Sequence, residues 1–117
     1  MQGRRVDRIE EQLRIEISEI LERELQDPRA HFVTVTGVKV SPDLRHARVF
    51  ISVLGGAEER KKALQGLRSA ANFVRRSLGK RLHHLKRIPE LVFDYDESID
   101  KALRIEELLD QIKSEAE

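Results

Sequence analysis

The chain has 117 residues and a formal net charge of +1 at pH 7, with 39% hydrophobic and 37% charged residues. This length supports one hydrophobic core but not two, so we expect a single domain over residues 1–117, with its core at about 4–112 and a frayed acidic end at 113–117. The absence of cysteine excludes disulfide scaffolds, thiolate zinc sites and iron–sulfur clusters, and no apolar run is long enough for a membrane span. We therefore expect a cytoplasmic protein with no membrane partner.

The amino-terminal segment predicts an amphipathic helix. Apolar residues recur every three or four positions from Val6 to Leu25, and charged residues fill the other side. The helix should end at Asp27 and Pro28, because proline disfavours helical geometry in the residue before it and has no amide donor.

Two strands and a tight turn follow. Residues 32–40 are rich in β-branched side chains, and the valines change from odd to even positions at Gly37, which predicts a strand with a bulge there. Pro42 and Asp43 favour a turn, and residues 45–54 alternate between apolar and polar as a second strand does.

A long helical pattern begins at Ala57 and runs to Leu85. A helix of about thirty residues would be ~45 Å long, which exceeds the size of a compact domain of this length. We therefore predict two helices that meet in a kink at Ala70, Ala71 and Asn72, where the amides of the second helix would face outward and bind phosphate.

The last two elements are a strand at 89–96 and a helix that begins near Ser98 and carries apolar residues up to Ile112. The order is helix, strand, strand, helix, kink, helix, strand and a further carboxyl-terminal helix. This order predicts an α+β domain with a three-stranded sheet and its helices packed on one face.

The net charge hides a strong asymmetry along the chain. Residues 60–89 hold ten basic and no acidic residues, whereas residues 90–117 hold three basic and ten acidic residues. A local positive field predicts attraction to phosphate better than net charge does, although a solvated helix face is the simpler alternative. Arginine predominates, and its planar fork suits phosphate, while Phe73 is the one aromatic residue in the block. We expect recognition of RNA or DNA through backbone and shape.

The sequence offers little for catalysis. No two of the four histidines have the four-residue spacing of a helical metal site, and no glycine-rich phosphate loop is present. Asp94 and Asp96 lie on one side of a strand, where a solvated edge is commoner than an acid–base pair. We expect no enzyme activity, no metal, no cofactor and no small-molecule substrate.

Several local strings together resemble the ribosome-binding factor A family, which has a type II KH-like fold. They are QDPR at 26–29, VKVSPDL at 38–44, ARVF at 47–50, FVRRSLGK at 73–80 and RIPEL at 87–91. The resemblance covers about residues 4–112. It implies a factor that binds the maturing small (30S) ribosomal subunit and its 16S rRNA, assists late maturation and 5′-end processing, and has no catalytic activity. In that family an Ala-x-Gly kink joins the two central helices, and Ala70-Ala71-Asn72 occupies its place, with asparagine for glycine.

We therefore expect a monomeric RNA-binding protein whose basic block contacts rRNA phosphates. Two alternatives stay open: a general KH-like RNA-binding module, and a protein interaction adapter that uses its first or last helix. The predicted RNA-binding residues are Arg68, Asn72, Arg75, Arg76, Lys80, Arg81, Lys86 and Arg87.

Overall fold

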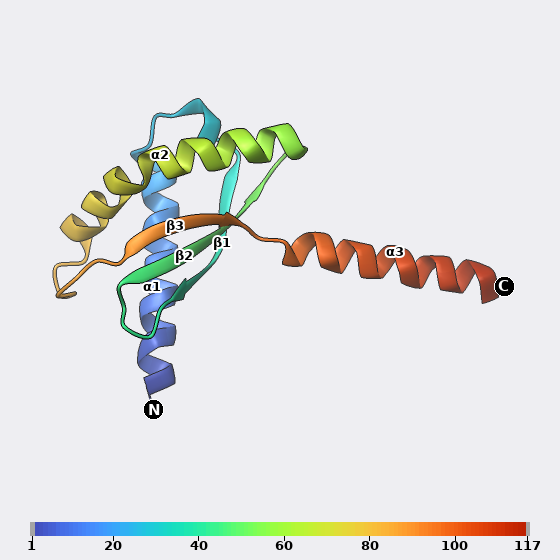
Figure 1. Cartoon of the computed structure of the whole chain (residues 1–117), viewed down its shortest axis with the longest axis horizontal. Helices are drawn as coiled ribbons and strands as arrows, with labels where there is room; N and C mark the ends of the chain where they lie inside the picture. Colours follow the sequence, from blue (N-terminus) through green and yellow to red (C-terminus); the bar gives the residue numbers. More distant parts are fainter. Residues whose placement is uncertain (1, 117) are drawn as a thin grey trace.

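A computed structural model describes residues 2–116 and contains the predicted α+β arrangement, with one helix where two were expected between the second and third strands (Figure 1). The elements are helix α1 (Gln2–Arg23), the 3₁₀ turn η1 (Pro28–Ala30), strands β1 (Val33–Val40) and β2 (His46–Val53), helix α2 (Ala57–Arg81), strand β3 (Glu90–Tyr95) and helix α3 (Ser98–Ala116).

The three strands form one sheet in the order β1-β2-β3. β1 and β2 are an antiparallel hairpin, whereas β3 runs parallel to β2, with His46 opposite Glu90. The parallel pairing requires a crossover, and α2 supplies it over one face of the sheet (Figure 1). On the covered face Ala47, Val49 and Ile51 of β2 are fully buried, as the predicted alternation requires.

The bulge predicted near Gly37 is confirmed. Val35 pairs with Ile51 and Gly37 pairs with Phe50, so Thr36 is the extra residue of β1. The Thr36 hydroxyl donates to the carboxylate of Asp96, 2.6 Å away. The bulge therefore ties β1 to the end of β3.

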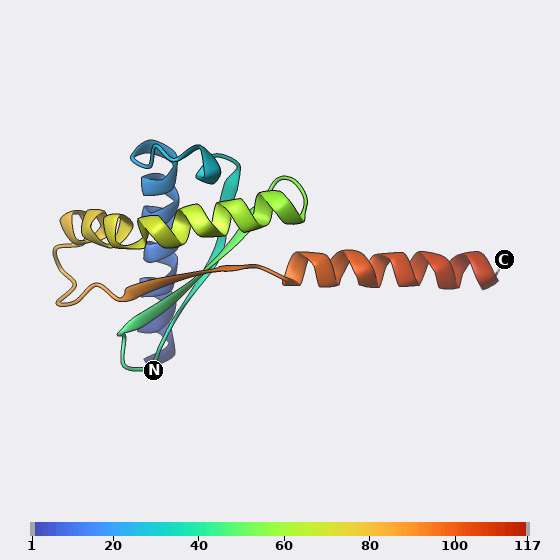
Figure 2. The same cartoon turned by 45° about the horizontal axis from the view of Figure 1, so that its top comes forward.

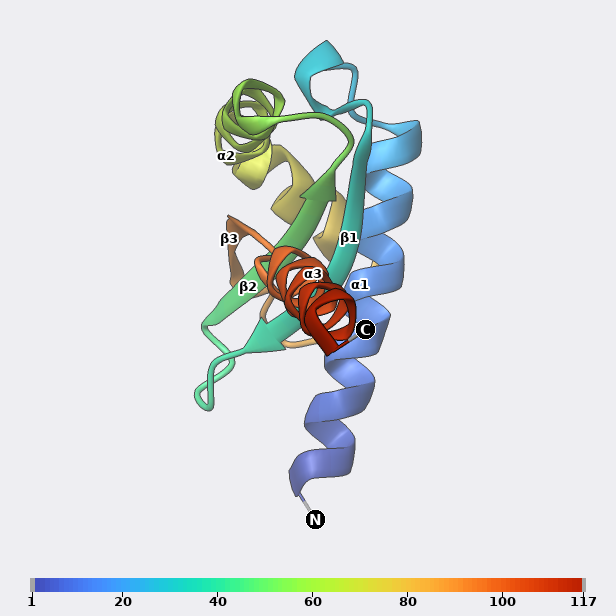
Figure 3. The same cartoon turned by 90° about the vertical axis from the view of Figure 1, so that its right-hand side faces the viewer.

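Helices α1 and α2 form the layer that covers the sheet. α1 packs mainly on β1 and α2 mainly on β3, and the two helices contact each other (Figure 3). Burial of these apolar side chains is the main source of stability of the domain. The fully buried side chains at the centre of this core are Leu13, Ile17, Ile20, Val49, Ile51, Leu67, Val74, Leu78 and Phe93.

The first helix ends at Arg23, four residues before the predicted end at Asp27. The Leu25 amide donates to the carbonyl of Ile20 at 3.1 Å, which closes the helix with a wider turn. The Asp27 carboxylate then accepts from the amide of Arg29 at 2.9 Å and caps the short turn η1. The proline is thus the first residue of a new turn, while the preceding residues have already left α1.

The second helix is continuous, which corrects the prediction of two helices meeting at Ala70, Ala71 and Asn72. All residues from 57 to 81 are helical. Asn72 does not use left-handed geometry, because within residues 2–116 Leu44 is the one non-glycine residue with positive φ. The helix axis bends between its green and yellow halves (Figures 1 and 3). No helix amino terminus is therefore presented at this point to bind phosphate.

Helix α2 is kept within the size of a compact domain by ending early, and not by the predicted break at Ala70, Ala71 and Asn72. The helix stops at Arg81 after 25 residues, which corresponds to about 38 Å. Leu82 leaves helical geometry, with φ −114° and ψ 62°, and residues 82–89 return the chain to the sheet. The bend and this earlier end together let one helix fit where the sequence suggested two.

The third helix does not join the helical layer, which corrects the expectation that all helices pack on one face. α3 extends away from the sheet in both Figure 1 and Figure 2, and residues 101–116 are all exposed. The apolar residues of α3 do recur with helical spacing, as predicted. Such spacing shows that a helix has an apolar face, but it does not show which part of the protein packs on that face. None of the helices within residues 2–116 is long and apolar enough to span a membrane.

The carboxyl-terminal end of α3 is regular as far as it is described. The helix continues to Ala116. Glu117 lies outside the described residues.

Candidate nucleic-acid interface

The basic block at residues 60–89 occupies α2 and the segment that leads to β3. The buried side of α2 consists of Ala63, Gly66, Leu67, Val74 and Leu78, which face the sheet and α1. The basic side chains lie on the remaining faces, as the amphipathic pattern predicts. They divide into those that bind other parts of the chain and those that do not.

Arg81 belongs to the first group. Its guanidinium forms ion pairs with Glu16 at 3.0 Å, Glu19 at 3.4 Å and Glu24 at 3.4 Å, all from α1 or its end. The hydrogen bond to Glu16 is the main cause of a raised pKa of Arg81. Only 24% of the Arg81 side chain is exposed, although the charge pattern suggested it as an RNA contact. Arg81 joins α2 to α1.

Arg75 also binds internally. Its Nε and Nη2 atoms donate to the carbonyl oxygen of Ile88 at 3.1 and 2.9 Å. The side chain is half-buried, because the segment 82–89 folds back beside α2. Arg75 therefore positions the backbone next to Arg87.

Two further arginines bind the third strand and its continuation. Arg68 donates to the Phe93 carbonyl at 3.3 Å and lies 3.4 Å from the carboxylate of Asp94, but its side chain remains 57% exposed. Arg60 pairs with Asp100 at 3.0 Å and lies 4.1 Å from the centre of the Tyr95 ring. Arg68 is still accessible to a ligand, whereas Arg60 has an internal role.

The second group is exposed and concentrates at the carboxyl-terminal half of α2 and the segment after it. Among the side chains of the described residues, no carboxylate lies within ion-pairing distance of these cations. We call them the basic surface. It consists of Arg76, Lys80, Lys86 and Arg87, with exposed Asn72 and Arg68 beside it. The two remaining cations of the block, Lys61 and Lys62, are exposed near the other end of α2.

The parallel pairing of β2 with β3 adds a residue that the sequence analysis missed. The amide of Glu90 donates to the carbonyl of Arg45 at 2.8 Å, which brings the hairpin beside the end of the basic block. Arg45, His46, Arg75, Arg87 and Glu90 line a hollow of about 320 Å³. Arg45 lies outside the block at 60–89, so only knowledge of the strand pairing would have found it.

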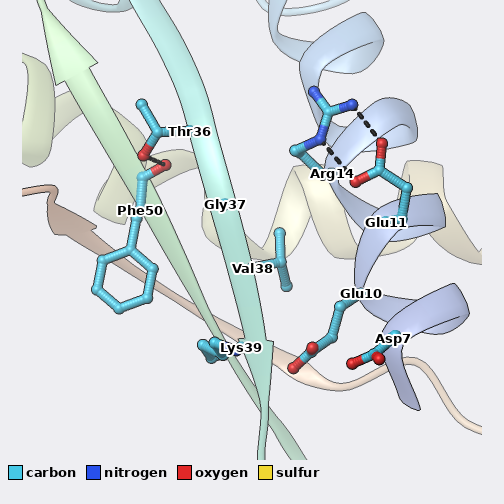
Figure 4. Close-up of a pocket in the computed structure, with 9 residues that line it drawn as sticks. All are labelled: Asp7, Glu10, Glu11, Arg14, Thr36, Gly37, Val38, Lys39 and Phe50. Atoms are coloured by element: carbon cyan, nitrogen blue, oxygen red, sulfur yellow. Dashed lines mark hydrogen bonds and ion pairs between the residues drawn. The ribbon is translucent and has the colours of Figure 1, made fainter. Parts of the chain in front are cut away.

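A second hollow, between α1 and β1, has the opposite charge (Figure 4). Its volume is about 330 Å³, and Asp7, Glu10 and Glu11 come from its α1 side. Glu10 accepts from the amide of Val40 at 2.8 Å and thereby covers the edge of β1. A phosphate would be repelled here, because carboxylates outnumber the cations Arg14 and Lys39.

The carboxylates considered for acid–base work have structural partners. Asp94 accepts from Arg48 at 2.8 Å. Asp96 accepts from the hydroxyl of Ser98 and from Thr36, and these hydrogen bonds lower its pKa. Asp96 therefore remains ionised at neutral pH. Both carboxylates are engaged in contacts within the chain. Within residues 2–116 there is no cluster of three or more metal-ligating side chains.

The comparison with known proteins agrees with this architecture. The family model described as ribosome-binding factor A matches residues 5–109. The chain is 48% identical over 112 residues to ribosome-binding factor A of Natranaerobius thermophilus, covering 96% of this chain and 85% of that protein. It is 49% identical over 115 residues to that of Thermomicrobium roseum, covering 98% and 88%.

Solved structures of the same family share the fold. The crystal structure of ribosome-binding factor A from Thermus thermophilus superposes with a TM-score of 0.69 at 28% identity, over 77% of this chain and 93% of that one. A Thermus thermophilus homology model fitted into a cryo-EM map of a 30S complex gives a TM-score of 0.62 at 27% identity, over 75% and 91%. With the fold, the matched residues and the sequence identity in agreement, the chain belongs to the ribosome-binding factor A family.

Proposed function

We propose that this protein binds the maturing 30S subunit in the cytoplasm and contacts its 16S rRNA through the basic surface. It assists late maturation and 5′-end processing of the rRNA as a non-enzymatic assembly factor. The observation that carries the proposal is the group of exposed cations without internal partners on one part of a chain of this family. A relative of the same fold has been fitted into the map of a 30S complex.

The exposed and the internally bound basic residues have different roles in this proposal. Arg76, Lys80, Lys86 and Arg87 contact phosphates, because their charges are not neutralised within the described chain. Arg75 and Arg81 hold the segment 82–89 and α1 in place, and thus shape the surface. Arg68 and Asn72 flank it, and Arg68 has exposed area for a further contact.

Selectivity for the subunit would come from shape and not from base reading. Phe73, which is 38% exposed, is the one aromatic side chain of α2, so stacking on several bases is not available there. Contacts between cations and phosphates bear little sequence information. The acidic hollow between α1 and β1 would be repelled by RNA and would limit the orientations in which the protein docks.

Sedimentation with purified particles tests the proposal. The protein is mixed with mature small subunits, precursor-containing small subunits and large subunits, and the bound fraction is measured after centrifugation. We expect binding to small subunits and little to large ones. Equal binding to all particles would favour a general RNA-binding module. Selective binding that survives charge reversal of the basic surface would favour an adapter that docks on protein.

A further inference from the structure

We propose that the hollow at the start of β3 is a ribonucleotide subsite. Arg45 and Arg87 would hold one phosphodiester group of the RNA, and Glu90 would accept a hydrogen bond from the neighbouring 2′-hydroxyl. The inference deepens the proposed function and rests on it, because it names the chemical unit that one part of the interface recognises.

Three separate segments build the hollow. The hairpin supplies Arg45, the segment after α2 supplies Arg87, and β3 supplies Glu90 at its first position. The hydrogen bond from the Glu90 amide to the Arg45 carbonyl, 2.8 Å long, fixes two of these segments to each other. The volume of about 320 Å³ is at the lower end of the range for small-ligand pockets and suits one nucleotide.

The backbone beside Arg87 is held in place from α2. Arg75 donates two hydrogen bonds to the carbonyl of Ile88, the residue next to Arg87. A cation on a fixed backbone loses less conformational entropy on binding than one on a mobile loop. The hollow is therefore preorganised, although Arg87 itself is exposed.

The cations of the hollow fit a phosphodiester. Arg45 and Arg87 are both exposed, and within the described chain neither has a carboxylate at ion-pairing distance. Arg75 adds a third guanidinium at the wall of the hollow, with two of its donor atoms already used. Guanidinium groups donate parallel hydrogen bonds to phosphate oxygens, which makes arginine well suited to this ligand.

The carboxylate of Glu90 indicates that the ligand of the hollow is RNA and not an inorganic anion such as phosphate. It repels phosphate, yet it is a strong acceptor for a hydroxyl group. RNA carries a 2′-hydroxyl beside every phosphate, and DNA does not. The Nε2 atom of His46 lies 3.4 Å from Oε2 of Glu90. The Glu90 side chain is nevertheless 65% exposed and accessible to a ligand.

A binding assay with oligonucleotides tests the arginines. The affinity of the full chain for a short single-stranded RNA is measured by fluorescence anisotropy across a salt series, with DNA of the same sequence as comparison. We expect Arg45→Gln with Arg87→Gln to weaken RNA binding about tenfold at low salt and to reduce the slope of log K against log salt by about 0.7, the value for one lost phosphate contact. The control Lys61→Gln with Lys62→Gln removes the same charge from the other end of α2.

Two substitutions of Glu90 distinguish the effect of its negative charge from the effect of its hydrogen-bond acceptor oxygen. Both Glu90→Ala and Glu90→Gln remove the negative charge and should strengthen DNA binding. We expect Glu90→Ala to lower the ratio of RNA affinity to DNA affinity at least threefold, whereas Glu90→Gln keeps an acceptor oxygen and should retain most of that ratio. An unchanged ratio in Glu90→Ala, or no preference for RNA in the parent protein, would overturn the inference.

The outcomes also separate this inference from the proposed function. If the parent protein sediments selectively with small subunits while the arginine pair behaves like its lysine control, the subsite is wrong and the function stands. If the parent protein prefers RNA through these residues but binds all particles equally, the subsite stands and the proposed function fails.

Discussion

The Arg75 guanidinium donates two hydrogen bonds, 3.1 and 2.9 Å long, to the carbonyl oxygen of Ile88, thirteen residues along the chain. These bonds join the carboxyl-terminal half of α2 to the segment that enters β3. An arginine that the charge pattern suggests as an RNA contact is therefore occupied in holding the backbone beside other cations.

This relationship predicts different effects for two adjacent arginines. We expect Arg75→Ala to lower the free energy of unfolding by about 1.5–3 kcal/mol, since hydrogen bonds from a charged donor are lost and a partly buried carbonyl is left unpaired. Arg76→Ala, at an exposed position, should change stability by less than about 0.5 kcal/mol but reduce the salt slope of RNA binding by about 0.7. Urea unfolding and a salt series on both variants check this. Equal stability of the two variants would contradict the structural role of Arg75.

Two glycines of α2 should respond in opposite ways to alanine. A Cβ atom at Gly66 would lie 3.1 Å from the Cβ of Arg29, because α2 crosses close to η1, whereas at Gly79 the nearest atom, in Ile88, is 3.9 Å away. Gly66→Ala should lose about 1–2 kcal/mol, an overpacking cost of about 1–3 kcal/mol offset in part by helix propensity. Gly79→Ala should gain up to about 1 kcal/mol from the same propensity. Thermal unfolding compares them, and a stabilised Gly66→Ala would refute the close approach.

The Asp27 carboxylate should make stability depend on pH in acid. The Arg29 side chain, with its amide, lowers the pKa of Asp27 from 3.8 to about 2. A carboxyl whose pKa is depressed in the folded state stabilises it fully above the unfolded value, and this contribution is lost as pH falls through the folded value. The parent protein should therefore be more stable than Asp27→Asn at pH 6, and their melting temperatures should converge between pH 4 and pH 2. A constant difference over that range would contradict the Arg29 pairing.

The exposed state of α3 predicts that the rest of the fold does not depend on it. The large apolar side chains between residues 103 and 112 are 51% to 61% exposed and do not belong to the core, so their burial contributes little to the stability of the fold. Removal of residues 102–117 keeps the Arg60 pair with Asp100 and should change the free energy of unfolding by less than about 0.5 kcal/mol. A loss of several kcal/mol in urea unfolding would show that α3 packs on the domain in solution.

Local sequence patterns predicted most of the fold. The alternation in β2 and the change of valine parity at Gly37 identified the hairpin and its bulge, because one buried face fixes the register of a strand. The end of α1 and the continuity of α2 were missed. The chain leaves α1 after Arg23, and Leu25 packs against the core outside the helix. Ala70 and Ala71 have high helix propensity, so they favour a continuous α2.

The candidate site was harder to predict from the sequence than the fold was. The block of ten cations could be counted, but which of them remain unpaired depends on contacts between distant positions. Arg81 meets Glu16, which is 65 residues away, and Arg45 meets the block only because β2 and β3 are parallel. The spacing of charges along the chain cannot predict these contacts, because it describes a single helix or strand and not the neighbours that this element has in the folded protein.

The most direct test of the central claim is the affinity for small subunits of a variant in which the basic surface carries Arg76→Glu, Lys80→Glu and Lys86→Glu. Its control carries Lys61→Glu, Lys62→Glu and Lys113→Glu, an equal change of net charge at other exposed positions. We expect the first variant to lose binding and the control to retain it. In the parent protein the salt slope should be steep, at about 0.7–0.9 per phosphate contact. Equal affinity of the two variants would show that the basic surface does not bind the subunit.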